Sequence, residues 1–210
     1  MPHSRIPAIL VTGAAGAGKT TLIASLLAKR PAAERWAVLI NDFGVVTLAD
    51  APGVLGGMVA AREVAGCICC TAQVSLRIAL VALLRETRPQ RLLIEASSAA
   101  QPSALRRVLE ERGITDAVEL CSSICVVDPE QLADVRYVTN DAYREQIAAA
   151  DAIVIREGER MTPAARDAAR AEIGKLRSGP VRYVDAATVD IDAVDRAGDT
   201  SNPLPSQPSP

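Results

Sequence analysis

Three of the five cysteines of this chain lie within four positions, in the stretch "GCICC" at residues 66–70. Cys67, Cys69 and Cys70 can present up to three thiolates to a single ion. Such a set suits a borderline or soft metal such as Zn²⁺ or Co²⁺ and matches Mg²⁺ or Ca²⁺ poorly. Two alternatives stay open from the residues alone, which are burial of the thiols in a core and a thiol redox role.

A second stretch, "GAAGAGKTT" at residues 13–21, satisfies the pattern G-x-x-x-x-G-K-[ST]. It follows an apolar run and precedes a helical pattern, which is the context that a phosphate-binding loop requires. Its glycines let backbone N–H groups turn inward around a phosphate, and the helix N-terminus adds partial positive charge. Lys19 would reach the β- and γ-phosphates, and the Thr20 hydroxyl would ligate Mg²⁺. The pattern predicts a nucleotide site formed by Gly13, Gly16, Ala17, Gly18, Lys19, Thr20 and Thr21.

Two carboxylates are expected close to that loop. Glu95 ends the apolar run "RLLIE", where an acid can hold Mg²⁺, directly or through water, or orient an attacking water. Asp42, in "INDFG", also follows an apolar run and is expected to sense the metal or the phosphate. An ordinary turn is the alternative for Asp42. Lys19 and Glu95 are therefore the predicted catalytic residues, with Thr20, Asp42 and Glu95 as predicted Mg²⁺ ligands.

The elements that must position these residues alternate along the chain. The apolar runs are nearly continuous in hydrophobicity, as is typical of strands buried on both faces. They cover residues 6–12, 36–41, 91–96, 121–128, 151–155 and 181–185. Predicted helices lie between them at residues 19–30, 72–87, 102–112, 129–149 and 162–177. This alternation predicts right-handed β-α-β units in a doubly wound, mostly parallel α/β sheet, with ligands at the carboxyl ends of the strands.

Composition argues against several other classes of protein. Hydrophobic residues make up 49% of the 210 residues, charged residues 23%, and the net charge is −2. These values are typical of a soluble globular protein and give no electrostatic attraction to nucleic acid or to an anionic membrane. No apolar run reaches the roughly 18 residues of a membrane span. The first residues lead straight into the glycine-rich loop, unlike a signal peptide, so we expect a cytoplasmic protein.

Two further expectations concern the rest of the chain. Cys121 and Cys125 fall in a predicted strand, and we expect them to behave as small buried apolar residues. The final stretch, "GDTSNPLPSQPSP", is rich in proline and has almost no apolar residues. Such a composition predicts a disordered tail at residues 191–210 after a nucleotide-binding domain at residues 1–190, and the start of a linker to a second domain is the alternative.

The order of the motifs resembles that of the CobW-like family of P-loop GTPases. The stretches that carry the resemblance are "GAAGAGKTT", "VLINDFG", "EVAGCICC", "LLIEASSAAQP" and an apolar strand ending in "VVD". The resemblance covers roughly residues 6–155, and the cysteine triplet preceded by Glu63 and Gly66 is its most specific part. It implies a SIMIBI-type GTPase domain that binds GTP and Mg²⁺, a transition metal at the triplet, and a metalloprotein client.

The chain departs from that family at four places. Residues 156–159, "REGE", stand where the family has Asn-Lys-x-Asp for reading guanine. There Glu159 can accept from the guanine N1–H and N2–H groups in place of the family's Asp. Ser98 replaces a glycine of the segment that follows Glu95, and Asp42 replaces a glutamate. The C-terminal domain typical of the family does not follow in this sequence.

The leading functional hypothesis is a GTP-hydrolysing metallochaperone that couples nucleotide state to the binding and delivery of zinc or cobalt. The alternative is a non-catalytic metal- or nucleotide-binding module, which the altered "REGE" segment and Ser98 favour. A small-molecule P-loop kinase is a third possibility, but no arginine-rich substrate lid is recognisable in the sequence. The metal, the client and the oligomeric state are not specified by the residues.

Overall fold

Seven parallel strands form one sheet in this computed structural model, which describes residues 5–40, 59–63, 72–156, 161–177, 182–185 and 189–198. The strands lie in the order β3-β2-β4-β1-β5-β6-β7. Their bounds are β1 Ile6–Thr12, β2 Trp36–Ile40, β3 Val59–Glu63, β4 Arg91–Glu95, β5 Val118–Val127, β6 Ala152–Ile155 and β7 Arg182–Asp185. All pairings between them are parallel, which confirms the predicted α/β architecture.

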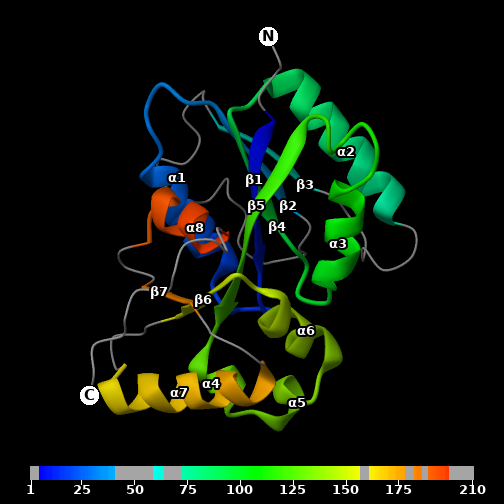
Figure 1. The fold of residues 1–210 in the computed structure, drawn as a ribbon. Coiled ribbons are helices and arrows are strands. Elements are labelled where there is room, and N and C mark those ends of the chain that lie inside the picture. Colours follow the sequence, from blue (N-terminus) through cyan, green and yellow to red (C-terminus); the bar gives the residue numbers. More distant parts are fainter. Residues whose placement is uncertain are drawn as a thin grey trace.

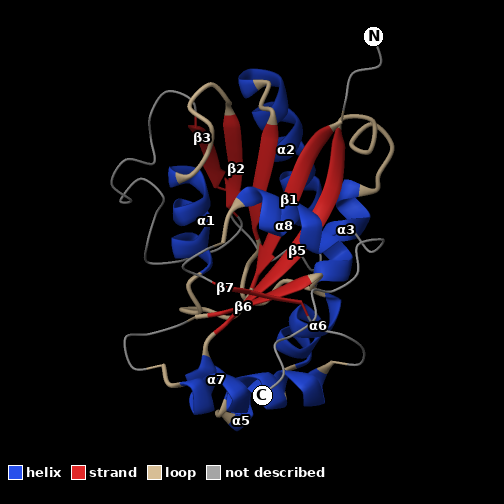
Figure 2. Cartoon of the chain, turned by 60° about the vertical axis from the view of Figure 1, so that its left-hand side comes forward, coloured by secondary structure: helices blue, strands red, loops and turns tan. Residues whose placement is uncertain are grey.

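Helices cover both faces of the sheet, as Figures 1 and 2 show. Residues of β1 alternate between two cores: Ile9 and Val11 pack with α1 and α8, whereas Ala8 and Leu10 pack with α2 and α3. A third cluster joins β5 and β6 to α4, α6 and α7. The helices are α1 Lys19–Ala28, α2 Ala72–Thr87, α3 Pro102–Leu109, α4 Pro129–Leu132, α5 Val135–Val138, α6 Asp141–Ala149, α7 Pro163–Leu176 and α8 Ile191–Gly198. Burial on both faces explains why the strands are almost wholly apolar.

Two elements were missed by the sequence analysis. Strand β3, with the sequence "VAARE", pairs with β2 at the edge of the sheet. Among the described residues one neighbouring strand, β2, flanks it, and its mixed composition lacks the continuous apolar signal of the central strands. Helix α8 extends to Gly198, past the predicted domain boundary at residue 190, and its Val194 is fully buried in the core beside α1. The prediction of disorder from residue 191 onward was therefore wrong for 191–198, while residues 199–210 lie outside the described residues.

The helix predicted at residues 129–149 is broken into α4, α5 and α6. Each piece starts at its own N-cap side chain: Asp128 accepts from the backbone N–H of Glu130 at 3.0 Å, Asp134 from that of Arg136 at 2.9 Å, and Asn140 from that of Tyr143 at 3.0 Å. Short polar side chains of this kind compete with helix continuation by bonding to nearby backbone. The sequence analysis therefore predicted the helical character of residues 129–149 but not the breaks.

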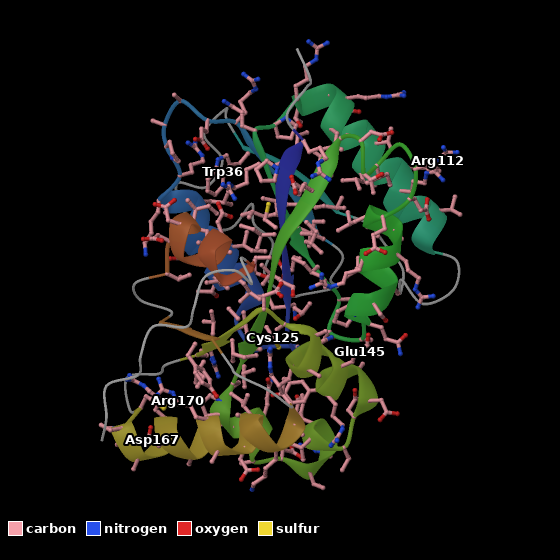
Figure 3. The ribbon with its side chains drawn as sticks, in the orientation of Figure 1. Trp36, Arg112, Cys125, Glu145, Asp167 and Arg170 are labelled. Atoms are coloured by element: carbon pink, nitrogen blue, oxygen red, sulfur yellow. The ribbon has the colours of Figure 1, made fainter. Side chains whose placement is uncertain are left out.

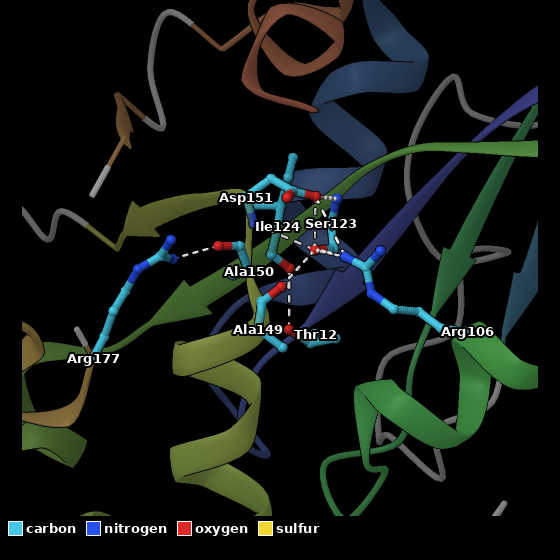
Figure 4. A network of polar contacts seen from close by, with 8 residues as sticks. All are labelled: Thr12, Arg106, Ser123, Ile124, Ala149, Ala150, Asp151 and Arg177. Atoms are coloured by element: carbon cyan, nitrogen blue, oxygen red, sulfur yellow. Dashed lines mark hydrogen bonds and ion pairs between the residues drawn. The ribbon is translucent and has the colours of Figure 1, made fainter. Parts of the chain in front are cut away.

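A polar network ties α3 to the start of β6 beneath the site (Figure 4). Asp151 Oδ2 accepts from the Ser123 backbone N–H at 2.7 Å and lies 3.0 Å from Ser123 Oγ. Arg106 donates to Ser123 Oγ at 2.9 Å, and Arg177 donates to the Ala150 carbonyl. These contacts fix where β6 begins, and therefore where its carboxyl end meets the phosphate loop.

No helix in the part of the chain described here is long and apolar enough to cross a membrane.

Candidate functional site

The glycine-rich loop between β1 and α1 takes the left-handed backbone conformations that a phosphate cradle requires. Gly13, Gly16 and Gly18 have φ angles of 140°, 76° and 105°. A Cβ built at Gly13 would lie 2.4 Å from the Val126 carbonyl oxygen of β5, so only glycine fits there. The loop is thus held tightly against β5 and presents the N-terminus of α1 as an anion site.

Lys19 is the first residue of α1 and is 4% exposed. Its Nζ donates to the carbonyls of Gly13 and Ala14, both at 3.1 Å, so the ammonium group spans the loop from inside. Of the other predicted loop residues, Ala17 is fully buried and bonds back to Ala14, whereas Thr21 is exposed on the first turn of α1. The loop therefore concentrates backbone dipoles and one buried cation around a space suited to phosphate.

Thr20 and Glu95 come from elements far apart in sequence and meet beside the loop. Thr20 Oγ1 donates to Glu95 Oε1 at 2.7 Å, and Glu95, at the end of β4, is 2% exposed. A hydroxyl and a carboxylate form the all-oxygen kind of ligand set that Mg²⁺ takes. The residues present therefore fit the cation that the sequence predicts, with Thr20 and Glu95 as the groups that would hold it.

Two glutamines that sequence reasoning missed brace the site. Gln131 of α4 donates to the Ala15 carbonyl of the phosphate loop at 2.7 Å. Gln146 of α6, which is fully buried, donates to the carbonyls of Ser98 and Ala100 at 3.1 and 2.9 Å. The segment after Glu95 and the phosphate loop are thus both fixed by side chains from the broken helical region. The only sequence signal was a polar residue on an otherwise apolar helical face.

A second missed pair lies on the opposite side of the loop from Glu95. Arg156 follows β6, and its guanidinium donates to the carboxylate of Asp128 at the end of β5. The alkyl part of Arg156 passes over the loop, since its Cδ lies 3.4 Å from a Cβ built at Gly18. The first residue of "REGE" therefore lies beside the phosphate loop.

The remaining predicted site residues lie outside the described residues, namely Asp42, Cys67, Cys69, Cys70 and Glu159. Within the described ranges, no group of three or more His, Cys, Asp and Glu side chains is arranged to hold a metal ion. The strand ends that lead to these residues are described. Ile40 of β2 is in register with both Glu63 of β3 and Glu95 of β4. The segments carrying Asp42 and the triplet therefore start at the carboxyl ends of their strands, level with Glu95.

The two described cysteines differ in burial: Cys125 is buried as expected, whereas Cys121 is only partly buried. Cys125 is fully buried in β5 (Figure 3), and burial raises the pKa of its thiol to about 12. The pKa of Cys121 is also raised, mainly by burial and then by the charges of Asp195 and Glu119. Both shifts reduce the thiolate fraction at neutral pH, and the thiolate is the form that reacts and binds metals.

We expect the folded Cys67/Cys69/Cys70→Ser variant to react poorly with a thiol reagent at pH 8. Cys125 stays unmodified until the protein unfolds, and Cys121 reacts slowly, because both pKa values are raised. Quantitative titration with a disulfide reagent, before and after addition of guanidinium, checks this.

Because an unfolded thiol titrates near pH 9, the contribution of Cys125 to stability is complete below pH 9 and is lost as the pH rises towards 12. Rapid native labelling of Cys125 would contradict its burial.

Comparison with known proteins agrees with this geometry. The zinc chaperone YeiR of Escherichia coli is 36% identical over 159 residues, covering 76% of this chain and 48% of YeiR. The zinc chaperone CobW of Sinorhizobium is 28% identical over 220 residues, covering 91% of this chain and 62% of CobW. The crystal structure of the Zn(II)-bound YjiA GTPase from E. coli superposes with a TM-score of 0.64 at 20% identity, covering 94% of this chain and 63% of that one.

These matches place the described fold and loop in one family. The chain spans about half the length of YeiR and less than two thirds of CobW, so the comparison concerns only part of each relative. A family model for the nucleotide-binding domain of CobW, HypB and UreG matches residues 7–180, which include the phosphate loop, Glu95 and Arg156. The chain therefore belongs to the CobW/HypB/UreG family and carries its nucleotide-binding domain.

Proposed function

We propose that this protein binds and hydrolyses GTP and couples its nucleotide state to the binding and delivery of a transition metal, zinc or cobalt, to a metalloprotein client. The observation that carries the nucleotide part is the joint placement of Lys19 and the Thr20–Glu95 pair around the phosphate loop. The names of the relatives, two of them zinc chaperones, support the metal part.

In this proposal each residue at the loop has a defined task. The N–H groups of the loop and the N-terminus of α1 bind the β-phosphate, and Lys19 balances charge on the β- and γ-phosphates. Thr20 and Glu95 hold Mg²⁺, which when bound neutralises phosphate oxygens, and Asp42 is the proposed further ligand. Glu159 is proposed to accept from the N1–H and N2–H of guanine. The residues that bind the triphosphate thus also stabilise the charge that moves during its hydrolysis.

The cysteine triplet is the proposed transition-metal site. Cys67, Cys69 and Cys70 would supply three thiolates, which leaves one position for a water or for a ligand from the client. An incomplete ligand set suits a carrier, because structural zinc is usually closed by four protein ligands. The triplet segment joins β3 to α2, and β3 ends in register with Glu95. We propose that bound nucleotide and bound metal change one another's affinity through these adjacent strand ends.

Two replacements favour a second candidate, a binding module without turnover. Arg156 takes the place of the first residue of the guanine-reading motif, and Ser98 that of a glycine in the segment after Glu95. In such a module the loop would still bind nucleotide, while hydrolysis would not exceed that of a variant lacking the loop lysine. Turnover measured with and without Zn²⁺ separates the two candidates.

The test of the proposal is a titration of the anaerobically reduced protein with Zn²⁺ and Co²⁺. We expect tight binding that weakens by about 100-fold or more in the Cys67/Cys69/Cys70→Ser variant, because the thiolates supply most of the binding free energy. We also expect the affinity to differ between the nucleotide-free form and the form bound to Mg²⁺ and a non-hydrolysable GTP analogue.

The control for this titration is the Cys121→Ser variant, whose replaced thiol lies in β5. It should bind both metals like the wild type. Equal metal affinity in the wild type and the triple variant would remove the metallochaperone proposal and leave a nucleotide-binding protein. Triplet-dependent binding that ignores the nucleotide would remove only the coupling.

A further inference from the structure

Arg156 lies beside the phosphate loop, at the position where the family motif begins with asparagine. Its backbone N–H donates to the Val127 carbonyl at 2.8 Å, so its main chain is fixed by the pairing of β5 with β6. Its guanidinium bonds to Asp128, whose side chain is 9% exposed and whose other oxygen caps α4. A buried acid on a rigid element thus orients this arginine over Gly18.

The order of the strands indicates which part of a nucleotide meets Arg156. Glu95 ends β4 and Arg156 follows β6, and β1 with its phosphate loop lies between them. Thr20 and Glu95 would hold a cation on the β4 side of the loop, where it would neutralise charge at the γ end of a triphosphate. The γ end of the triphosphate therefore lies towards β4, and the nucleoside end lies towards β5 and β6.

The guanidinium group of an arginine can bind the edge of a guanine base that carries O6 and N7. The side chain of Arg156 is 50% exposed, and among the described residues its guanidinium makes one hydrogen bond, from Nη2 to Asp128. That bond uses one of the two N–H groups of Nη2, so the second one and the parallel N–H of its neighbour, Nη1 or Nε, are directed to a ligand. Guanine presents two acceptors, O6 and N7, along one edge, which a guanidinium can bind with two parallel hydrogen bonds. Adenine presents N7 beside a donor amino group, so it cannot accept both bonds.

From this geometry we infer that Arg156, oriented by Asp128, reads the O6/N7 edge of a 6-oxopurine nucleotide. It takes over base selection from the missing Asn-Lys contacts, on an edge that Glu159 would not use. The inference rests on the proposed guanine-nucleotide function and goes further, because it names the atoms recognised and the residue responsible. Asp128 is a positioning residue in this arrangement.

The experiment measures the affinities of GTP, ATP and 7-deaza-GTP, which lacks the N7 acceptor, by calorimetry in the presence of Mg²⁺. For the wild type we expect GTP to bind about 10- to 100-fold more tightly than ATP. We expect 7-deaza-GTP to bind about 3- to 10-fold more weakly than GTP, the effect of one lost hydrogen bond. In Arg156→Ala the ratio of GTP to 7-deaza-GTP affinity should fall towards one, and the ratio of GTP to ATP affinity should fall to the part that Glu159 supplies, mainly because GTP binds more weakly.

Two further variants sharpen the measurement. Arg156→Lys keeps the positive charge but not the planar fork, so its relative affinities for the three nucleotides should resemble those of Arg156→Ala. Arg112→Ala is the matched control, because Arg112 is exposed on the turn that leads into the amino end of β5, at the opposite edge of the sheet from the loop (Figure 3). It should bind all three nucleotides like the wild type.

The outcomes separate this inference from the proposed function. A wild type that binds 7-deaza-GTP as tightly as GTP overturns the inference without the need for any variant. An Arg156→Ala variant that loses affinity for GTP and ATP by the same factor also overturns it, and assigns Arg156 to the phosphates. If no nucleoside triphosphate binds the wild type, the proposed function itself fails.

Discussion

Replacing Lys19 by alanine is expected to lower the rate of GTP hydrolysis by about 100- to 1,000-fold, the usual effect of removing one preorganised charge from a reacting centre. The ammonium group is buried within the phosphate loop and spans the carbonyls of Gly13 and Ala14. In this low-dielectric setting it interacts with phosphate charge far more strongly than a surface lysine would. Single-turnover hydrolysis with saturating nucleotide and Mg²⁺ measures the effect on the chemical step.

A matched control for this variant is Lys175→Ala. Lys175 lies on α7, is 68% exposed and pairs with Glu172 at 2.6 Å, an exposed ion pair of small energetic value. Its replacement should leave turnover within about twofold of the wild type. The loss of this exposed ion pair lowers the free energy of unfolding by at most about 1 kcal/mol, so the protein stays folded. Equal hydrolysis by wild type and Lys19→Ala would show that this loop does not carry the turnover, and would leave the binding-module candidate.

The second large effect is expected from Gly13→Ala, which should lower the free energy of unfolding by about 3 kcal/mol. At φ 140° an alanine is strained, and its Cβ would lie 2.4 Å from the Val126 carbonyl oxygen, which is backbone of a central strand and cannot move aside cheaply. The loop must lift away from β5 to relieve this contact. Urea denaturation gives the change from the midpoint, provided that the slope stays constant.

Gly174→Ala is the matched comparison and should act in the opposite direction. Gly174 lies inside α7, and a Cβ built there meets no atom within 4 Å. Alanine in a helix interior is more stable than glycine by roughly 0.5–1 kcal/mol, so this variant should unfold at a higher urea concentration. If the two variants shift the midpoint alike, the phosphate loop is not held against β5 in the way that the distance to Val126 implies.

Much of the site was predictable because its signals are local. The phosphate loop needs glycines, a lysine and a threonine at fixed spacing, and the left-handed angles at Gly13, Gly16 and Gly18 agree with that requirement. Glu95 was predictable because it ends a continuous apolar strand. The contact between Thr20 and Glu95 followed from the general rule that ligands gather at the carboxyl ends of parallel strands. The catalytic and ligand roles of Lys19, Thr20 and Glu95 stay predictions, as do those of Asp42, Glu159 and the cysteine triplet.

The sequence by itself determined the α/β class, the central strands, the phosphate loop and the cluster of thiols, because each depends on the residue types within one short segment. The tertiary structure decided what depends on contacts between distant segments. Edge strand β3 forms because β2 offers it hydrogen bonds, and α8 forms because the core beside α1 buries Val194. Arg156 meets Asp128 and Gly18 only because β6, β5 and β1 are neighbours in the sheet, an order that no local pattern specifies.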